Sequence, residues 1–367
     1  MNSDLFSNRT IQTIKSFDRP AVGWFCTYTP LEILEAARLT PVRVSGDHLP
    51  ARAADSLMHT NICPYIKSCL DAFEEGKLDF LSAAVFTSGC DAQRRLYDVL
   101  RERKPELPAY LINVPKKQGD AAEKRLAAEF RDFLQWTAAT FDREITDDAL
   151  ADAINKYKLL RARARRLDGA LRKIHPPLTG TMAAELMLIL QRMPPEEAVK
   201  MIDAEEEAMK KTQIPWKPKV LLAGNIVDDP AVVAMIERYG AHVFADNLCT
   251  GRKFWLMPSP PAGRPPVEAL ANAYMNKKPC PRMAGESDAV DEMRDLVDNL
   301  RPEGVIFYTM KFCDTHSYDT PRMREMLGEM GVKSLFIESD YTGGGGQAAT
   351  RIQAFVEMLN EDWEHAE

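Results

Sequence analysis

Six of the seven cysteines follow a pattern that repeats between the two halves of the chain. Three cysteines in the first half are followed by Thr, Pro and Asp in that order, and three in the second half are followed by the same residues. The six are Cys26, Cys63, Cys90, Cys249, Cys280 and Cys313. In both halves the outer two cysteines are separated by 64 positions. We interpret this pattern as an internal duplication.

Thiolates are soft ligands, and such a set of cysteines can bind zinc or an iron–sulfur cluster. A structural zinc site normally has C-x-x-C pairs. Here the cysteines within each half stand 27 to 37 positions apart, and they can meet only through the fold. The spacing therefore favours a cluster in a cleft. A lone cysteine is more often a buried apolar side chain, and we interpret Cys69, which has no counterpart, in that way.

Short apolar runs alternate with helical patterns in both halves of the chain. The runs predict strands at residues 21–25, 41–44, 79–86 and 109–114, and again at 219–223, 242–245, 304–310 and 334–337. Segments with helical spacing of apolar residues lie between them. This alternation is typical of parallel sheets covered by helices, and it predicts an α/β fold with two parallel-sheet units.

The strand pattern disappears between residues 121 and 211, where long, charged segments have helical periodicity. We therefore predict an N-terminal α/β domain at residues 1–145, a helical section at 146–213 and a C-terminal α/β domain at 214–367. Arginines 161, 163, 165 and 166 lie in the helical section, and we expect them to face solvent or to form part of a subunit surface.

The predicted elements place most of the six cysteines where ligands bind in α/β proteins. Cys26, Cys90, Cys249 and Cys313 each follow a predicted strand and precede a helix. The carboxyl ends of parallel strands form the ligand-binding edge of an open sheet. Cys63 precedes a proline, which is favoured in the first turn of a helix. A thiolate or an anionic cluster is stabilised at such a helix N-terminus.

Composition excludes several classes of protein. The 367 residues include 47 Lys and Arg against 54 Asp and Glu, for a net charge of -7, so we expect no nucleic-acid partner. No apolar run approaches the roughly 18 residues that span a membrane, and we expect no membrane association. The first 18 residues do not have the layout of a signal peptide. An odd number of dispersed cysteines indicates reduced thiols and a cytoplasmic location.

Other polar residues near the predicted sheet edges receive no catalytic assignment. Residues 343–346 are four glycines before a helical pattern and could present backbone amides to a phosphate or form a flexible turn. His316 could donate a proton near a cluster, although a lone histidine is more often a packing residue. Glu338 and Asp340 end a predicted strand, where acids commonly cap turns.

The segments around the cysteines, taken together, resemble the iron–sulfur subunits of the 2-hydroxyacyl-CoA dehydratase and benzoyl-CoA reductase family. The resemblance covers nearly the whole chain. The segments are GWFCTYTP at 23–30, NICPYIKS at 61–68, SGCD at 88–91, DNLCTG at 246–251, KFCD at 311–314 and GQAATRIQAFVE at 346–357.

This resemblance implies two flavodoxin-like (Rossmann-like) units and additional helices around a cleft. It implies an oxygen-sensitive enzyme of anaerobic metabolism with a 4Fe-4S cluster, and it assigns cluster ligation to Cys63, Cys90 and Cys313. Single low-potential electrons would come from a separate ATP-hydrolysing activator iron–sulfur protein. The substrate would be an acyl-CoA that is dehydrated or reduced, and a homologous second subunit would complete a heterodimer or homodimer.

Two alternatives remain open from the sequence. The double-cubane cluster proteins of the same superfamily are ATP-driven reductases of small molecules. In that case an 8Fe-9S double-cubane cluster would also use Cys26, Cys249 and Cys280 as ligands. The other alternative is a non-catalytic partner subunit that binds CoA or relays electrons. We expect one cubane and about four iron atoms per chain, since the strongest motifs surround three cysteines.

Overall fold

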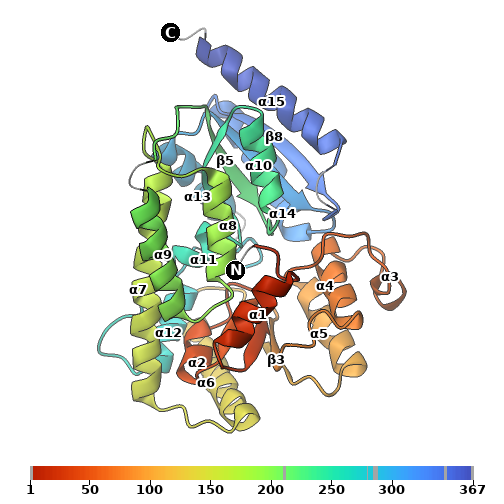
Figure 1. Ribbon diagram of the computed structural model, residues 1–367, viewed down its shortest axis with the longest axis vertical. Helices are drawn as coiled ribbons and strands as arrows, with labels where there is room; N and C mark the ends of the chain where they lie inside the picture. Colours follow the sequence, from red (N-terminus) through yellow and green to blue (C-terminus); the bar gives the residue numbers. More distant parts are fainter. Residues whose placement is uncertain (1–2, 210–211, 279, 284–287, 343–344, 365–367) are drawn as a thin grey trace.

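The computed structural model describes residues 3–209, 212–278, 280–283, 288–342 and 345–364. Two sheets and the helices around them form the molecule (Figure 1). The first half contains α1 (Asn8–Ser16), β1 (Ala21–Trp24), α2 (Leu31–Ala36), β2 (Thr40–Arg43), α3 (Ala54–Leu57), α4 (Pro64–Glu74), β3 (Ala83–Thr87), α5 (Asp91–Arg103) and β4 (Ala109–Ile112). Helices α6 (Asp120–Phe141), α7 (Asp147–Leu171), α8 (Gly180–Leu190) and α9 (Pro195–Met209) follow. The remainder contains β5 (Lys219–Gly224), α10 (Pro230–Arg238), β6 (His242–Asn247), α11 (Arg252–Trp255), α12 (Pro266–Met275), α13 (Asp288–Leu300), β7 (Gly304–Met310), α14 (Asp314–Glu329), β8 (Lys333–Ser339) and α15 (Gln347–Glu364).

Both sheets have four parallel strands in the same order. The first sheet is ordered β2-β1-β3-β4 and the second β6-β5-β7-β8. This shared order confirms the prediction of an α/β fold with two flavodoxin-like units, and it supports an internal duplication. The predicted domain limits stay a prediction, because packing crosses them.

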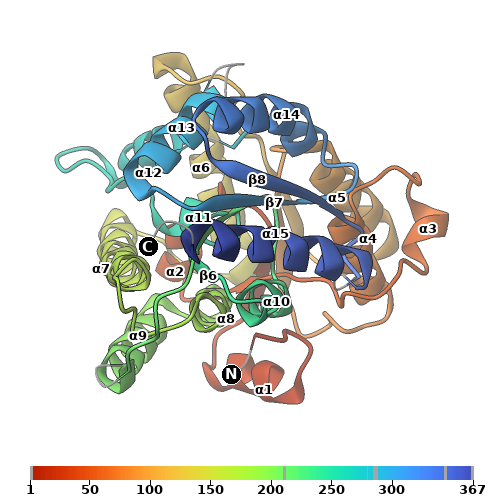
Figure 2. The ribbon, with the colours of Figure 1, turned by 90° about the horizontal axis from the view of Figure 1, so that it is seen from above.

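The inner strands β1, β3, β5 and β7 are apolar over nearly their whole length because both faces of each sheet are covered. Alternate residues of one strand enter different cores: Leu221 and Ala223 pack on one face of β5, and Val220 and Leu222 pack on the other. Seen from above, α13 and α14 lie on one side of the second sheet, and α10 and α15 lie on the other (Figure 2).

Helices α6 to α9 confirm the predicted helical middle section, but Arg161 does not face solvent. Its side chain is 3% exposed and pairs at 2.7 Å with the fully buried Glu32 on α2. The neighbouring Arg163 and Arg166 form ion pairs with acids on α9 instead. A helix that packs against neighbours on two sides buries part of its charged face. The run of arginines in the sequence does not show which of them is buried.

The helix after β7 begins earlier than the sequence predicts. In the sequence, the helical spacing of apolar residues predicts a helix over residues 321–330. The structure places Pro321 inside α14, which starts at Asp314. This difference matters for the site, because it makes Cys313 the residue that precedes the helix.

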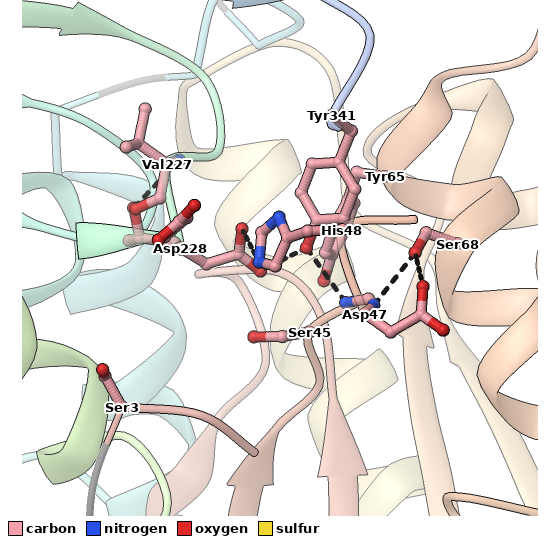
Figure 3. A network of polar contacts seen from close by, with 12 residues as sticks. Ser3, Ser45, Asp47, His48, Tyr65, Ser68, Val227, Asp228 and Tyr341 are labelled. Atoms are coloured by element: carbon pink, nitrogen blue, oxygen red, sulfur yellow. Dashed lines mark hydrogen bonds and ion pairs between the residues drawn. The ribbon is translucent and has the colours of Figure 1, made fainter. Parts of the chain in front are cut away.

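A network of polar contacts joins the two units (Figure 3). The hydroxyl of Tyr341, which follows β8, donates to buried Asp228 at 2.7 Å and accepts from the Gly46 backbone N–H at 3.0 Å. The ring of Tyr341 stacks on His48, with 4.2 Å between the ring centroids. Residues from both halves of the chain therefore depend on one phenol group.

Replacing Tyr341 by Phe is expected to lower the free energy of unfolding by about 1–3 kcal/mol, because a buried carboxylate oxygen and a buried N–H each lose a partner. Urea denaturation of the parent and variant measures this change. Tyr318→Phe is the matched control, since Tyr318 is 74% exposed. Equal urea midpoints for the parent and Tyr341→Phe would contradict the stabilising role assigned to the Tyr341 hydroxyl.

No helix in the described part of the chain is long and apolar enough to cross a membrane.

Candidate functional site

All six cysteines of the repeated pattern line one cavity between the carboxyl edges of the two sheets. The cavity has a volume of about 170 Å³. A single water molecule needs roughly 10–15 Å³ by the same measure, so a larger group has room there. All six thiols are free and partly exposed. The lining cysteines are Cys26, Cys63, Cys90, Cys249, Cys280 and Cys313.

Cys63, Cys90 and Cys313 share one structural position and are called here the N-cap triad. They are the N-cap residues of α4, α5 and α14. Pro64 occupies the first turn of α4, as the sequence predicted. The Cys90 sulfur accepts the backbone N–H of Gln93 at 3.5 Å. Three helix N-termini therefore direct partial positive charge toward thiols at one cavity.

The thiols of Cys63 and Cys90 are neutral without a positively charged ligand. Burial raises the pKa of both the Cys63 and Cys90 thiols to about 12. The nearby Cys313 thiol raises the pKa of Cys63 further, whereas the backbone N–H groups at the start of α4 lower it. A bound metal stabilises thiolates under these conditions, because its charge replaces the proton.

Cys26, Cys249 and Cys280 form the second triad, which has a different structural context. None of the three is a helix N-cap. Cys26 follows β1, Cys249 follows β6, and Cys280 lies beyond α12. Burial raises the pKa of Cys280 to about 12, and the Cys249 and Cys26 thiols add to the rise. The second triad is adjacent to the N-cap triad: a Cβ at Gly89 would lie 3.8 Å from the Cys26 sulfur.

The strand order corrects one part of the interpretation of the cysteine pattern as an internal duplication. Cys90 and Cys313 follow the third strand of their units, and Cys63 and Cys280 lie between the second and third strands, so these pairs are equivalent. Cys26, however, follows the first strand of its unit, whereas Cys249 follows the second strand of the other. The shared spacing of 64 positions does not make this pair equivalent. Cys26 and Cys249 thus reach one cavity from different places in the fold.

Arg43 positions the loops that carry Cys26 and Cys249, a role that sequence analysis missed. Its guanidinium donates to the Phe25 carbonyl at 3.3 Å and to the Cys249 carbonyl at 2.8 Å. Gln191, at the end of α8, accepts from Arg43 at 2.8 Å and donates to the Thr250 carbonyl at 2.7 Å. The helical middle section therefore helps to hold the loops of Cys26 and Cys249 in place.

A buried lysine lies behind the second triad and was also missed. The Lys277 ammonium donates to the Thr27 carbonyl at 2.7 Å and to the Thr27 hydroxyl at 2.8 Å. It lies 3.6 Å from the centroid of the Tyr28 ring. Burial lowers the pKa of Lys277 to about 8, while the nearby thiols of the second triad act in the opposite direction. The ammonium is therefore protonated at neutral pH.

The other candidate residues fall outside the site or have local roles. Cys69 is fully buried on α4, as expected of a core thiol. Asp340 accepts from the Thr342 hydroxyl and backbone N–H, so it caps a turn; Glu338 is exposed. His316 lines the cavity, and burial lowers its pKa to about 3, which leaves it neutral at physiological pH. The glycine-rich segment 343–346, for which the sequence left a phosphate-binding role and a flexible turn open, lies partly outside the described residues, at 343–344.

The donor set fits an iron–sulfur cluster. In the described chain no three His, Cys, Asp or Glu side chains lie close enough to hold one metal ion. Thiolates on a single zinc ion must all lie about 2.3 Å from it, whereas cluster thiolates bind separate iron atoms. Soft thiols spread around one cavity, three of them at helix N-termini, are suited to the second arrangement.

Comparison with known proteins identifies the family. The sequence model of the 2-hydroxyglutaryl-CoA dehydratase D-component family matches residues 26–359. The chain belongs to this family. The match includes all six cysteines of the cavity, and it confirms the resemblance seen in the sequence.

Relatives of this dehydratase-family chain align over almost its whole length. The beta subunit of (R)-phenyllactyl-CoA dehydratase from Clostridium sporogenes is 24% identical over 344 residues, which are 92% of this chain and 91% of the relative. A benzoyl-CoA reductase subunit from Thauera aromatica is 24% identical over 342 residues, 90% and 87% of the two chains. The beta subunit of lactoyl-CoA dehydratase from Anaerotignum propionicum is 25% identical over 351 residues, 92% and 91%. The chain is accordingly an enzyme subunit of the dehydratase or reductase type.

Proposed function

We propose that the chain is the iron–sulfur subunit of an oxygen-sensitive 2-hydroxyacyl-CoA dehydratase or benzoyl-CoA reductase type enzyme. Cys63, Cys90 and Cys313 would hold a 4Fe-4S cluster. The observation that carries the proposal is the position of these three thiols, each at a helix N-terminus and all on one cavity. The relatives named above are dehydratases and a reductase of acyl-CoA compounds, which supports an acyl-CoA as the substrate here.

When bound, the cluster supplies one-electron transfer at low potential. The chain's own residues hold it and shape its surroundings. The helix N-termini stabilise the negative charge of the thiolates, and the apolar lining, including Phe25 and Ile66, limits access of water to the cavity. Three protein thiolates would leave one iron of the cluster open to substrate or water.

The proposal includes three partners. Low-potential electrons would come from an ATP-hydrolysing activator iron–sulfur protein. A homologous second subunit would complete a heterodimer or homodimer, which agrees with the naming of the relatives as subunits of larger enzymes. The acyl-CoA would enter the cysteine cavity. We also propose that the protein is cytoplasmic.

A second candidate is an ATP-driven reductase of small molecules with an 8Fe-9S double-cubane cluster. The observation that favours it is the second triad, since Cys26, Cys249 and Cys280 line the same cavity as the N-cap triad. They are also partly exposed, unlike the core thiol Cys69. Six thiols around one cavity could serve as ligands for two joined cubanes.

Protein purified without oxygen is expected to be brown and to contain iron and acid-labile sulfide, because the cavity presents soft thiols to a metal. Exposure to air is expected to bleach it. Absorption spectra with iron and sulfide analysis measure both effects. A colourless, zinc-loaded protein prepared in the same way would overturn the proposed function.

A further inference from the structure

Lys277 is a buried cation fixed beside the cysteine cavity. It follows the C-cap of α12, and only 3% of its surface is exposed. Two oxygens of Thr27 accept its protons, and the face of Tyr28 covers it. Thr27 and Tyr28 line the cavity, so these two residues separate the ammonium from the cavity space. The charge is thereby held in one place.

The surroundings of Lys277 do not neutralise its charge. Among the described residues no carboxylate oxygen lies within 4.0 Å of the ammonium, and its contacts are a carbonyl, a hydroxyl and aromatic rings. Buried charges in proteins are normally paired, because removing an ion from water is costly. The ionisable groups that act most strongly on Lys277 are the thiols of Cys26, Cys280 and Cys249. We therefore expect the negative charge that balances the Lys277 ammonium to lie on the side of the cavity.

We infer that Lys277 is an electrostatic positioning residue, whose fixed positive charge raises the reduction potential of the iron–sulfur group in the cysteine cavity. This inference rests on the proposed function. One-electron reduction adds one negative charge to the group and changes no bond in the chain. A nearby cation stabilises the reduced form more than the oxidised form, and low dielectric in a buried site strengthens the effect. The inference holds for one cubane or two.

Lys277→Met keeps an unbranched side chain that is one atom shorter and removes its charge. We expect iron content equal to that of the parent and a midpoint potential that becomes more negative. The expected size is at least about a tenfold change in the reduction equilibrium constant, which corresponds to about 59 mV for one electron. Anaerobic redox titration followed by electron paramagnetic resonance measures the potential. Lys277→Arg retains the charge and is expected to stay near the parent.

Lys278→Met is the matched control, because the adjacent Lys278 side chain is 57% exposed. The midpoint potential of this variant is expected to equal that of the parent. If Lys277→Met does not fold, Lys277→Gln carries the same test, since its amide can still donate to Thr27. An iron-free parent would overturn the proposed function. An iron-loaded Lys277→Met or Lys277→Gln variant with the parental potential would overturn only the inference about Lys277, as would failure of both variants to fold.

Discussion

Cys63→Ala, Cys90→Ala and Cys313→Ala are each expected to prevent normal cluster assembly. Each substitution removes one of three thiols that precede helices α4, α5 and α14 at the same cavity. Burial disfavours a free thiolate at Cys63 and Cys90, so these thiols would ionise when a metal replaces their protons. A cluster on the N-cap triad would lose one of its three protein ligands in each variant. Iron and sulfide analysis of protein purified without oxygen measures the loss.

Cys69→Ala is the matched control for these variants. Cys69 lies on α4, the helix that Cys63 precedes, but it is fully buried in the core and does not line the cavity. We expect iron content near that of the parent, together with a loss of stability from the smaller side chain. If Cys69→Ala lost iron as the cavity variants do, the division of the cysteines into ligands and a core thiol would be wrong.

Much of the fold could be predicted because parallel strands covered on both faces are continuous apolar runs. The runs around Val22, Val85 and Ile306 are examples, and all three residues are fully buried. The position of Cys63 was predictable from Pro64, since proline in a first turn is a local property of the chain. The convergence of four cysteines on one cavity followed from placing them at the carboxyl ends of strands; they are Cys26, Cys90, Cys249 and Cys313.

The remaining features depend on contacts between residues that are distant in the sequence. Arg43 meets Gln191 across 148 positions and Cys249 across 206, and Lys277 meets Thr27 across 250. No local pattern marks either side chain as buried. The mismatch between Cys26 and Cys249 was hidden for another reason. Equal spacing and similar dipeptides suggested equivalence, and only the order of strands separates the two positions.

The two candidate functions predict different amounts of iron. For the proposed function we expect about four iron atoms per chain, because three thiolates hold one cubane, whereas a double cubane on six thiolates gives about eight. The structural reason for the lower value is that only the N-cap triad combines its thiols with helix N-termini, at Pro64, Asp91 and Asp314. Iron analysis of fully loaded protein, purified without oxygen, gives this number directly.

Cys26→Ala, Cys249→Ala and Cys280→Ala extend the measurement to the second triad. With one cubane on the N-cap triad, these variants are expected to keep the parental iron content, since none of the three thiols is then a ligand. Parent protein with about eight iron atoms, and loss of half or more in these variants, would instead assign the second triad as ligands. The acyl-CoA function would then give way to the double-cubane reductase. In that case Lys277, held against the loop of Cys26 by Thr27, would lie directly behind the added cubane's ligands.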